Sequence, residues 1–171
     1  MGKRRDNLAF TLVERGNRKR LRRLLRRHVE LLSSDTAMLV YAAIWRHWGM
    51  LRWLLERGLS PDCRMGKGGN TPLMDAAAHG DCRTIQLLLE FGADPAALNS
   101  ESENPLGFAV TWQQAKAVEL LVAAGVDVNN IDDSGPGKTQ LDWAELSQWT
   151  DMVTLLRGLG AKRYCELADH L

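Results

Sequence analysis

Cysteine, aromatic residues and long apolar runs are all scarce in this chain. Its 171 residues include three cysteines, Cys63, Cys82 and Cys165, and no Cys-x-x-Cys pair. The sequence therefore indicates neither a disulfide framework nor a zinc or redox dithiol site, and we expect a reducing, cytoplasmic setting. No apolar run approaches the roughly 20 residues that cross a bilayer, and the one near the amino terminus is too short for a secretory signal.

Apolar residues are abundant, and charge is unevenly distributed. The chain is 45% apolar and 25% charged, which predicts one folded domain over residues 1–171 rather than disorder. The net charge is only +1, yet residues 1–27 hold 11 of the 22 lysines and arginines against two acidic residues, a net +9. The remaining residues carry a net −8. This pattern predicts a basic end on an acidic body, which affects the choice of partner rather than the fold.

A repeat of 33 to 35 residues organises the chain. Four consecutive segments share a glycine, an alanine and a leucine in register: Gly58, Gly92, Gly125 and Gly160; Ala42, Ala76, Ala109 and Ala144; Leu54, Leu88, Leu121 and Leu156. A period of this length is typical of stacked repeats, each of which is one supersecondary unit.

Each segment predicts a helical hairpin, most clearly in the copy that begins at Thr71. Thr71 is a good N-cap for a first helix, and Pro72 suits the first helical position. Asn104-Pro105 repeats this pair, and Thr139-Gln140 keeps its cap without the proline. Apolar residues at helical spacing over 82–89 predict an amphipathic second helix. We expect Gly92 to end that helix in the left-handed conformation that glycine tolerates best.

This segment resembles the ankyrin repeat. It reads T-P-L-M-D-A-A-A-H-G and then L-L-L-E-F-G-A-D, close to the family pattern of T-P-L-H-x-A-A-x-x-G and L-L-x-x-G-A-D. The resemblance implies an all-α ankyrin-repeat solenoid, about five stacked antiparallel helix pairs with projecting loops, which binds proteins without catalysis. We expect a monomer divided into a basic capping pair (1–32), three repeats (33–65, 66–99 and 100–132) and a carboxy-terminal capping repeat (133–171).

The sequence departs from the family pattern in the first helices. Met74 and Gly107 stand where the family has histidine, so the loop-bracing hydrogen bonds of that side chain are not expected. Asp75 occupies a normally apolar position. Glycine is present in the turn between the helices at position 80 but not in its counterparts, which are Arg46, Gln113 and Gln148. We expect these departures to weaken the stack locally.

The resemblance places partner binding on the concave face, at the end of each first helix and in the loop before it. The register gives four helix-end pairs, Ile44-Trp45, Ala78-His79, Thr111-Trp112 and Leu146-Ser147, of which the first three are the partner-binding candidates. Trp45, His79 and Trp112 fall on equivalent positions and would form an aromatic ladder, and tryptophan is frequent at binding hot spots. The alternative is that both tryptophans pack against neighbouring repeats and serve only stability.

Loop tips are the second group of candidates. Lys67, Asn70, Glu101 and Glu103 would add polar contacts, and their alternative role is that of ordinary solvated loop. Of the remaining tryptophans, the register assigns three to the core and leaves Trp149 open; the three are Trp48, Trp53 and Trp143.

The basic segment over residues 18–27 supports a different function. Arg18, Arg22 and Arg26 could hold a phosphate backbone, an anionic surface or an acidic protein. Against nucleic acid, no aromatic residue is interleaved with the arginines and no known reading motif is present. The other alternative is a solvated cap face.

Signals for chemistry are weak. Gly135-Pro-Gly-Lys-Thr139 resembles the end of a P-loop, but Asp132 stands where that motif needs its first glycine and would repel phosphate. Asp75 and His79 share a helix face, where an Asp–His hydrogen bond is a better prediction than a metal pair, which would lack ligands. No nucleophile–base–orienter trio can be assembled from neighbouring repeats. We therefore expect no enzymatic activity, cofactor or metal.

Overall fold

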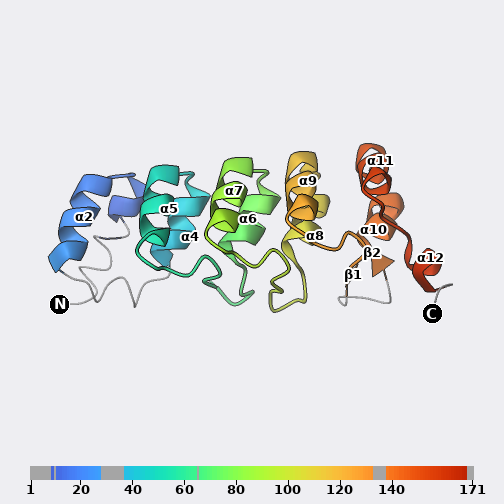
Figure 1. Cartoon of the computed structure of the whole chain (residues 1–171), viewed down its shortest axis with the longest axis horizontal. Helices are drawn as coiled ribbons and strands as arrows, with labels where there is room; N and C mark the ends of the chain where they lie inside the picture. Colours follow the sequence, from blue (N-terminus) through green and yellow to red (C-terminus); the bar gives the residue numbers. More distant parts are fainter. Residues whose placement is uncertain (1–8, 10, 28–36, 65, 133–137, 169–171) are drawn as a thin grey trace.

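Helix pairs stand side by side in a single row, and the loops between successive pairs project from one edge of that row (Figure 1). The computed structural model describes residues 9, 11–27, 37–64, 66–132 and 138–168. The helices and strands with assigned bounds are α2 (Arg18–Arg27), α4 (Ala37–Ile44), α5 (Trp48–Leu55), α6 (Pro72–Ala78), α7 (Cys82–Glu90), α8 (Pro105–Thr111), α9 (Ala115–Ala123), β1 (Ile131–Asp132), β2 (Lys138–Thr139), α10 (Gln140–Leu146), α11 (Thr150–Gly158) and α12 (Tyr164–Ala168). This is the helical solenoid that the repeat predicts.

The first helices begin at the residues that the sequence predicts as caps. The side chains of Thr71, Asn104 and Thr139 each accept a hydrogen bond from the backbone N–H three residues later. Pro72 and Pro105 occupy the first helical positions of α6 and α8, where a missing N–H is harmless. These helices are only seven residues long. Within the described part of the chain, no helix has both the length and the apolar composition that a bilayer crossing requires.

The turn between the two helices of a pair places one residue in the left-handed conformation. Gly80 has a φ of 61°, and its counterparts Arg46, Gln113 and Gln148 have φ of 56°, 54° and 59°. Gly16 has a φ of 60° between the helical residues 11–14 and α2. This conformation costs a residue other than glycine roughly 1–2 kcal/mol. The packing of each pair therefore imposes the turn even where the sequence does not favour it.

One apolar core runs the length of the row. Each pair from α4 to α11 contributes one fully buried leucine from its first helix and one from its second: Leu39 and Leu54, Leu73 and Leu88, Leu106 and Leu121, Leu141 and Leu156. Burying a leucine side chain stabilises a fold by about 1.5–3 kcal/mol. These leucines fix the pairs in place, so the first helices bring their ends into register.

The described residues at the two ends of the row are also helical. Leu21 and Leu25 of α2 are buried against the core. At the other end, residues 164–168 form the short helix α12. The strands β1 and β2 pair antiparallel, with Ile131 opposite Thr139, and are the one departure from an all-helical array in the described residues.

Candidate partner-binding site

The ends of the first helices form a line of exposed side chains, which we call the helix-end row. Its members are Ile44, Trp45, Ala78, His79, Thr111, Trp112, Leu146 and Ser147. Three large apolar side chains in it are open to solvent: Ile44 is 41% exposed, Trp112 is 62% exposed and Leu146 is 64% exposed. Leu146 occupies the same repeat position as Ile44, as the register predicts, although it is not one of the partner-binding candidates.

The predicted aromatic ladder is uneven. Trp45 is half-buried and stacks on Tyr41, with ring centroids 4.9 Å apart and planes at 23°. His79 is exposed, and Trp112 projects furthest into solvent. Neither indole is sealed from water, so both remain available to a partner, but only Trp112 presents most of its surface.

The predicted hydrogen bond between the Asp75 and His79 side chains is wrong. Nδ1 of His79 lies 2.7 Å from the backbone carbonyl oxygen of Asp75 instead. The i–4 carbonyl at the end of α6 is closer to the ring than the carboxylate is. Among the described residues, no group of three or more His, Cys, Asp or Glu side chains gathers where a metal could be held.

The loop-tip candidates divide into free and braced residues. Lys67 and Glu101 have exposed side chains. Asn70 and Glu103 are half-buried, and each accepts a hydrogen bond from Nδ2 of Asn99, at 2.9 Å and 3.0 Å. Sequence reasoning missed Asn99, whose own Oδ1 accepts from the backbone N–H groups of Glu101 and Glu103. This buried amide holds two projecting loops together.

Two of the three tryptophans assigned to the core are only half-buried. Trp53 is buried, as predicted. Trp48 instead lies beside Asp81, to whose Oδ2 its Nε1 donates at 3.3 Å, with Arg83 4.4 Å above its ring. Trp143 has Lys138 4.5 Å from its ring. Trp143 occupies a repeat position that faces the edge between successive first helices. Residues at this position are half-buried in every pair from α4 onward; the equivalents are Tyr41, Asp75 and Phe108.

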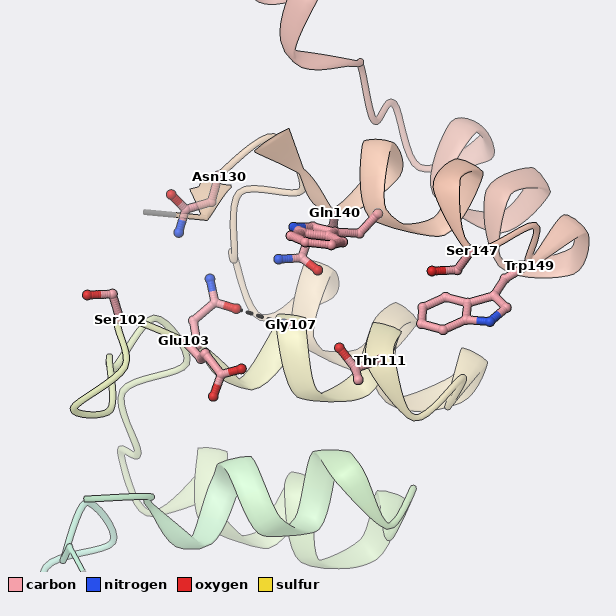
Figure 2. Close-up of a pocket in the computed structure, with 10 residues that line it drawn as sticks. Ser102, Glu103, Gly107, Thr111, Asn130, Gln140, Ser147 and Trp149 are labelled. Atoms are coloured by element: carbon pink, nitrogen blue, oxygen red, sulfur yellow. Dashed lines mark hydrogen bonds between the residues drawn. The ribbon is translucent and has the colours of Figure 1, made fainter. Parts of the chain in front are cut away.

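A groove of about 290 Å³ separates α8 from α10, and we call it the inter-repeat groove (Figure 2). It adjoins the helix-end row at Thr111 and Ser147, and Trp149 closes the same end. Its lining residues are Ser102, Glu103, Asn104, Gly107, Thr111, Asn130, Gln140, Trp143, Ser147 and Trp149. The sequence signal for it is Gly107, a residue without a side chain at a position that is filled in the neighbouring pairs.

Burial and hydrogen bonding shift three ionisable groups near these surfaces. Burial raises the pKa of Asp75, which the positive charge of His79 opposes. Burial also disfavours ionisation of Asp142, but hydrogen bonds from the backbone N–H groups of Thr139 and Tyr164 hold its pKa below the ordinary value. Burial raises the pKa of the Cys63 thiol to about 11, so this cysteine is protonated and unreactive at neutral pH.

The cations of α2 cover the amino-terminal end of the row. Arg18, Arg22 and Arg26 are exposed. Arg18 donates from Nη1 to the backbone oxygen of Gly49 at 3.4 Å, and the guanidinium of Arg22 lies 5.9 Å from the ring of Trp53. Between residues 18–26 and the described carboxylates, no ion pair forms. The predicted basic patch therefore keeps its charge while two of its arginines contact α5.

Comparison with known proteins identifies the repeats. A family model of three ankyrin repeats matches residues 73–164, and a model of many ankyrin copies matches residues 39–89. The chain belongs to the ankyrin repeat family. Ankyrin repeats are protein-interaction modules whose stacking creates an extended binding surface. The helix-end row and the projecting loops are the surfaces that this ankyrin array presents.

Three relatives show how far the similarity extends. The chain is 37% identical over 95 residues to cyclin-dependent kinase 4 inhibitor B of Bos taurus, covering 56% of this chain and 72% of the relative. It is 31% identical over 97 residues to ankyrin repeat and SOCS box protein 16 of Homo sapiens, covering 57% and 21%. It is 29% identical over 133 residues to a transient receptor potential cation channel subfamily A member 1 homolog of Caenorhabditis elegans, covering 75% and 11%. This ankyrin chain therefore spans a small part of the latter two proteins.

Proposed function

We propose that this ankyrin chain is a non-catalytic recognition module that binds a partner protein through the helix-end row and the adjoining loop tips. The observation that carries the proposal is the alignment of exposed apolar side chains at equivalent helix ends, Ile44, Trp112 and Leu146. A soluble surface rarely lines up large apolar groups without burying them against something. A stacked scaffold holds them rigidly, so little ordering entropy opposes association.

Inhibition by occlusion is the mode of action that we favour. The chain spans 72% of the length of a relative named as a kinase inhibitor, so an array of this size suits a protein that acts by binding alone. An adaptor or an effector would use the same surface. The three roles differ in what happens to the partner, because only an inhibitor lowers the partner's own activity in proportion to the fraction bound.

Affinity capture with matched variants tests the binding surface. The full chain is immobilised in the wild-type form and as the double variant Trp112→Ala, Leu146→Ala, and both are exposed to extract of the cells that make the protein. We expect partners retained by the wild type to be lost from the double variant, because each truncation removes a large exposed contact. Circular dichroism controls for folding, and a partner retained equally by both forms would reject the helix-end row as the site.

Binding of nucleic acid or an anionic surface through α2 is the second candidate. The exposed arginines Arg18, Arg22 and Arg26, which form no ion pair with a described carboxylate, favour it. Replacing Arg18, Arg22 and Arg26 with glutamine should then abolish binding to duplex DNA or anionic vesicles and remove its salt dependence. A wild-type chain that binds neither at low salt would dismiss this candidate and leave the first untouched.

A further inference from the structure

Gly107, which has no side chain, lies at the floor of the inter-repeat groove. Gly107 occupies the third helical position of α8, and a Cβ added there would lie 3.4 Å from Nε2 of Gln140. The equivalent residues of α4 and α6 are Val40 and Met74, and both are buried. Glycine therefore leaves space between α8 and α10 that a side chain occupies elsewhere in the row.

Two largely buried residues turn free amide groups into this space. Gln140 is only 6% exposed, and its carboxamide forms no hydrogen bond with any described residue, although Figure 2 shows it pointing from α10 towards Gly107. Asn104 is also 6% exposed; its Oδ1 accepts from the Gly107 N–H at 2.8 Å, while its NH₂ group has no partner within the described chain. These amide atoms are not sealed from water, so their hydrogen-bonding groups are open to a molecule in the groove. A carboxamide offers one acceptor and two donors, which matches the alternating groups of an extended peptide backbone.

The two ends of the groove have different chemistry. Ser102 and the Glu103 carboxylate lie at one end, and Ser147 and the indole of Trp149 lie at the other (Figure 2). Residues 100–132, which supply α8 and the adjoining loop, contain five acidic residues and one lysine. The carboxylate end therefore attracts a cation, and the indole end offers an apolar surface.

We propose that the inter-repeat groove binds an extended, cationic segment of a partner protein. The segment's backbone pairs with Asn104 and Gln140, a lysine or arginine reaches Glu103, and a large apolar side chain packs on Trp149. The proposal rests on the proposed function and deepens it, because it states which kind of partner segment the array selects. The volume of about 290 Å³ suits a few side chains and lies at the lower limit of ordinary small-molecule sites.

A random peptide library displayed on phage tests the groove directly against the full chain. We expect enrichment of sequences that share a lysine or arginine and a large apolar residue at a constant separation. A synthetic peptide of the consensus should bind Gly107→Met about tenfold more weakly or worse than wild type, because the new side chain fills the floor. Glu103→Gln should weaken the same peptide about two- to fivefold, as the loss of one partly exposed ion pair does.

Gly158→Met is the matched control. Gly158 is also a helical glycine, and a Cβ added there meets nothing within 4 Å. It does not line the groove, so the consensus peptide should bind this variant as tightly as wild type. Because both variants replace a helical glycine with methionine, only the position of the new side chain differs between them.

Three outcomes would overturn the proposal: no enriched sequence, enrichment of acidic sequences, or equal binding of the consensus peptide to Gly107→Met and wild type. The hypothesis that the helix-end row binds the partner is tested separately. Trp112 does not line the groove, so peptide binding that survives Trp112→Ala and is lost in Gly107→Met supports the groove even if partner capture ignores the row.

Discussion

Two edges between neighbouring first helices differ in the space that they enclose. One lies between α4 and α6, and the other lies between α8 and α10. The first encloses only about 10 Å³, and the second leaves about 290 Å³. Val40 and Gly107 are equivalent residues at the two edges, and only the first has a side chain to fill the space. The two edges thus differ at this repeat position, which carries a buried side chain at the narrow edge and none at the edge that leaves a groove.

The third helical position of the first helix carries a different residue in each later pair. Met74 is fully buried, and its sulfur accepts a hydrogen bond from the Thr71 N–H at 3.4 Å, closing a capping box. Asp142 closes the same box with Thr139 and also accepts from the Tyr164 N–H, which ties α12 to α10. Gly107 does neither. The family pattern has histidine at this position. In this chain Met74 is buried there, Gly107 leaves space, and Asp142 ties α12 to α10.

Emptying the same repeat position in α6, at the edge between α6 and α8, should have the largest effect. Met74→Gly removes a fully buried side chain and places glycine inside a helix, so we expect the free energy of unfolding to fall by about 3 kcal/mol or more. Urea denaturation followed by circular dichroism measures this. A loss below about 1 kcal/mol would show that α6 and α8 collapse into the space, and that a residue of this size is not needed there.

Replacing Asp142, which ties α12 to α10, should have an intermediate effect on stability that depends on pH. Asp142→Asn weakens the hydrogen bonds from Thr139 and Tyr164, so we expect a loss of about 1–2 kcal/mol at neutral pH. The pKa of Asp142 is lowered in the folded chain, so its stabilising contribution is complete above its ordinary value of 3.8 and disappears as the pH falls through the folded value. The same denaturation series at acid pH checks this, and a difference that grows on acidification contradicts it.

Filling the space between α8 and α10 should stabilise the chain modestly. Gly107→Met replaces a helical glycine with a good helix former, for which we expect a gain of about 1 kcal/mol. The melting temperature and the urea midpoint should both rise. If the variant is instead destabilised, the space beside Gln140 is too narrow for a side chain and the comparison with Met74 fails.

Neutralising Asp75, which lies at the edge between α4 and α6, should have the smallest effect on stability. Burial raises the pKa of Asp75, so its ionised form opposes folding at neutral pH. Asp75→Asn should therefore raise the free energy of unfolding slightly near pH 7, and the gain should vanish as the pH falls below 3.8, where the carboxyl becomes protonated in both states. Equal stabilities of the two proteins at every pH would show that His79 balances the burial.

Much of the fold and part of the site follow from the sequence. The repeat of glycine, alanine and leucine predicts the helix pairs, and Thr71, Asn104 and Thr139 predict where first helices begin, because a cap needs only its own helix to act. The register places Trp112 at a helix end, but its exposure does not follow from the register, because Trp45 at the equivalent position is half-buried. The pairing of Asn70 and Glu103 through Asn99 does not follow from the sequence either, because those residues meet across loops that only the stack brings together.

The sequence by itself determines that this chain is a row of ankyrin helix pairs with a basic end and an acidic body, since local caps and a fixed apolar period suffice to specify each pair. Only the tertiary structure decides which of its side chains reach solvent. Trp143 fills an apolar position in the pattern and yet lines a groove, because its burial depends on the distance between α8 and α10. That distance is set where Gly107 and Gln140 face each other, 33 residues apart in sequence and in contact only after the repeats have stacked.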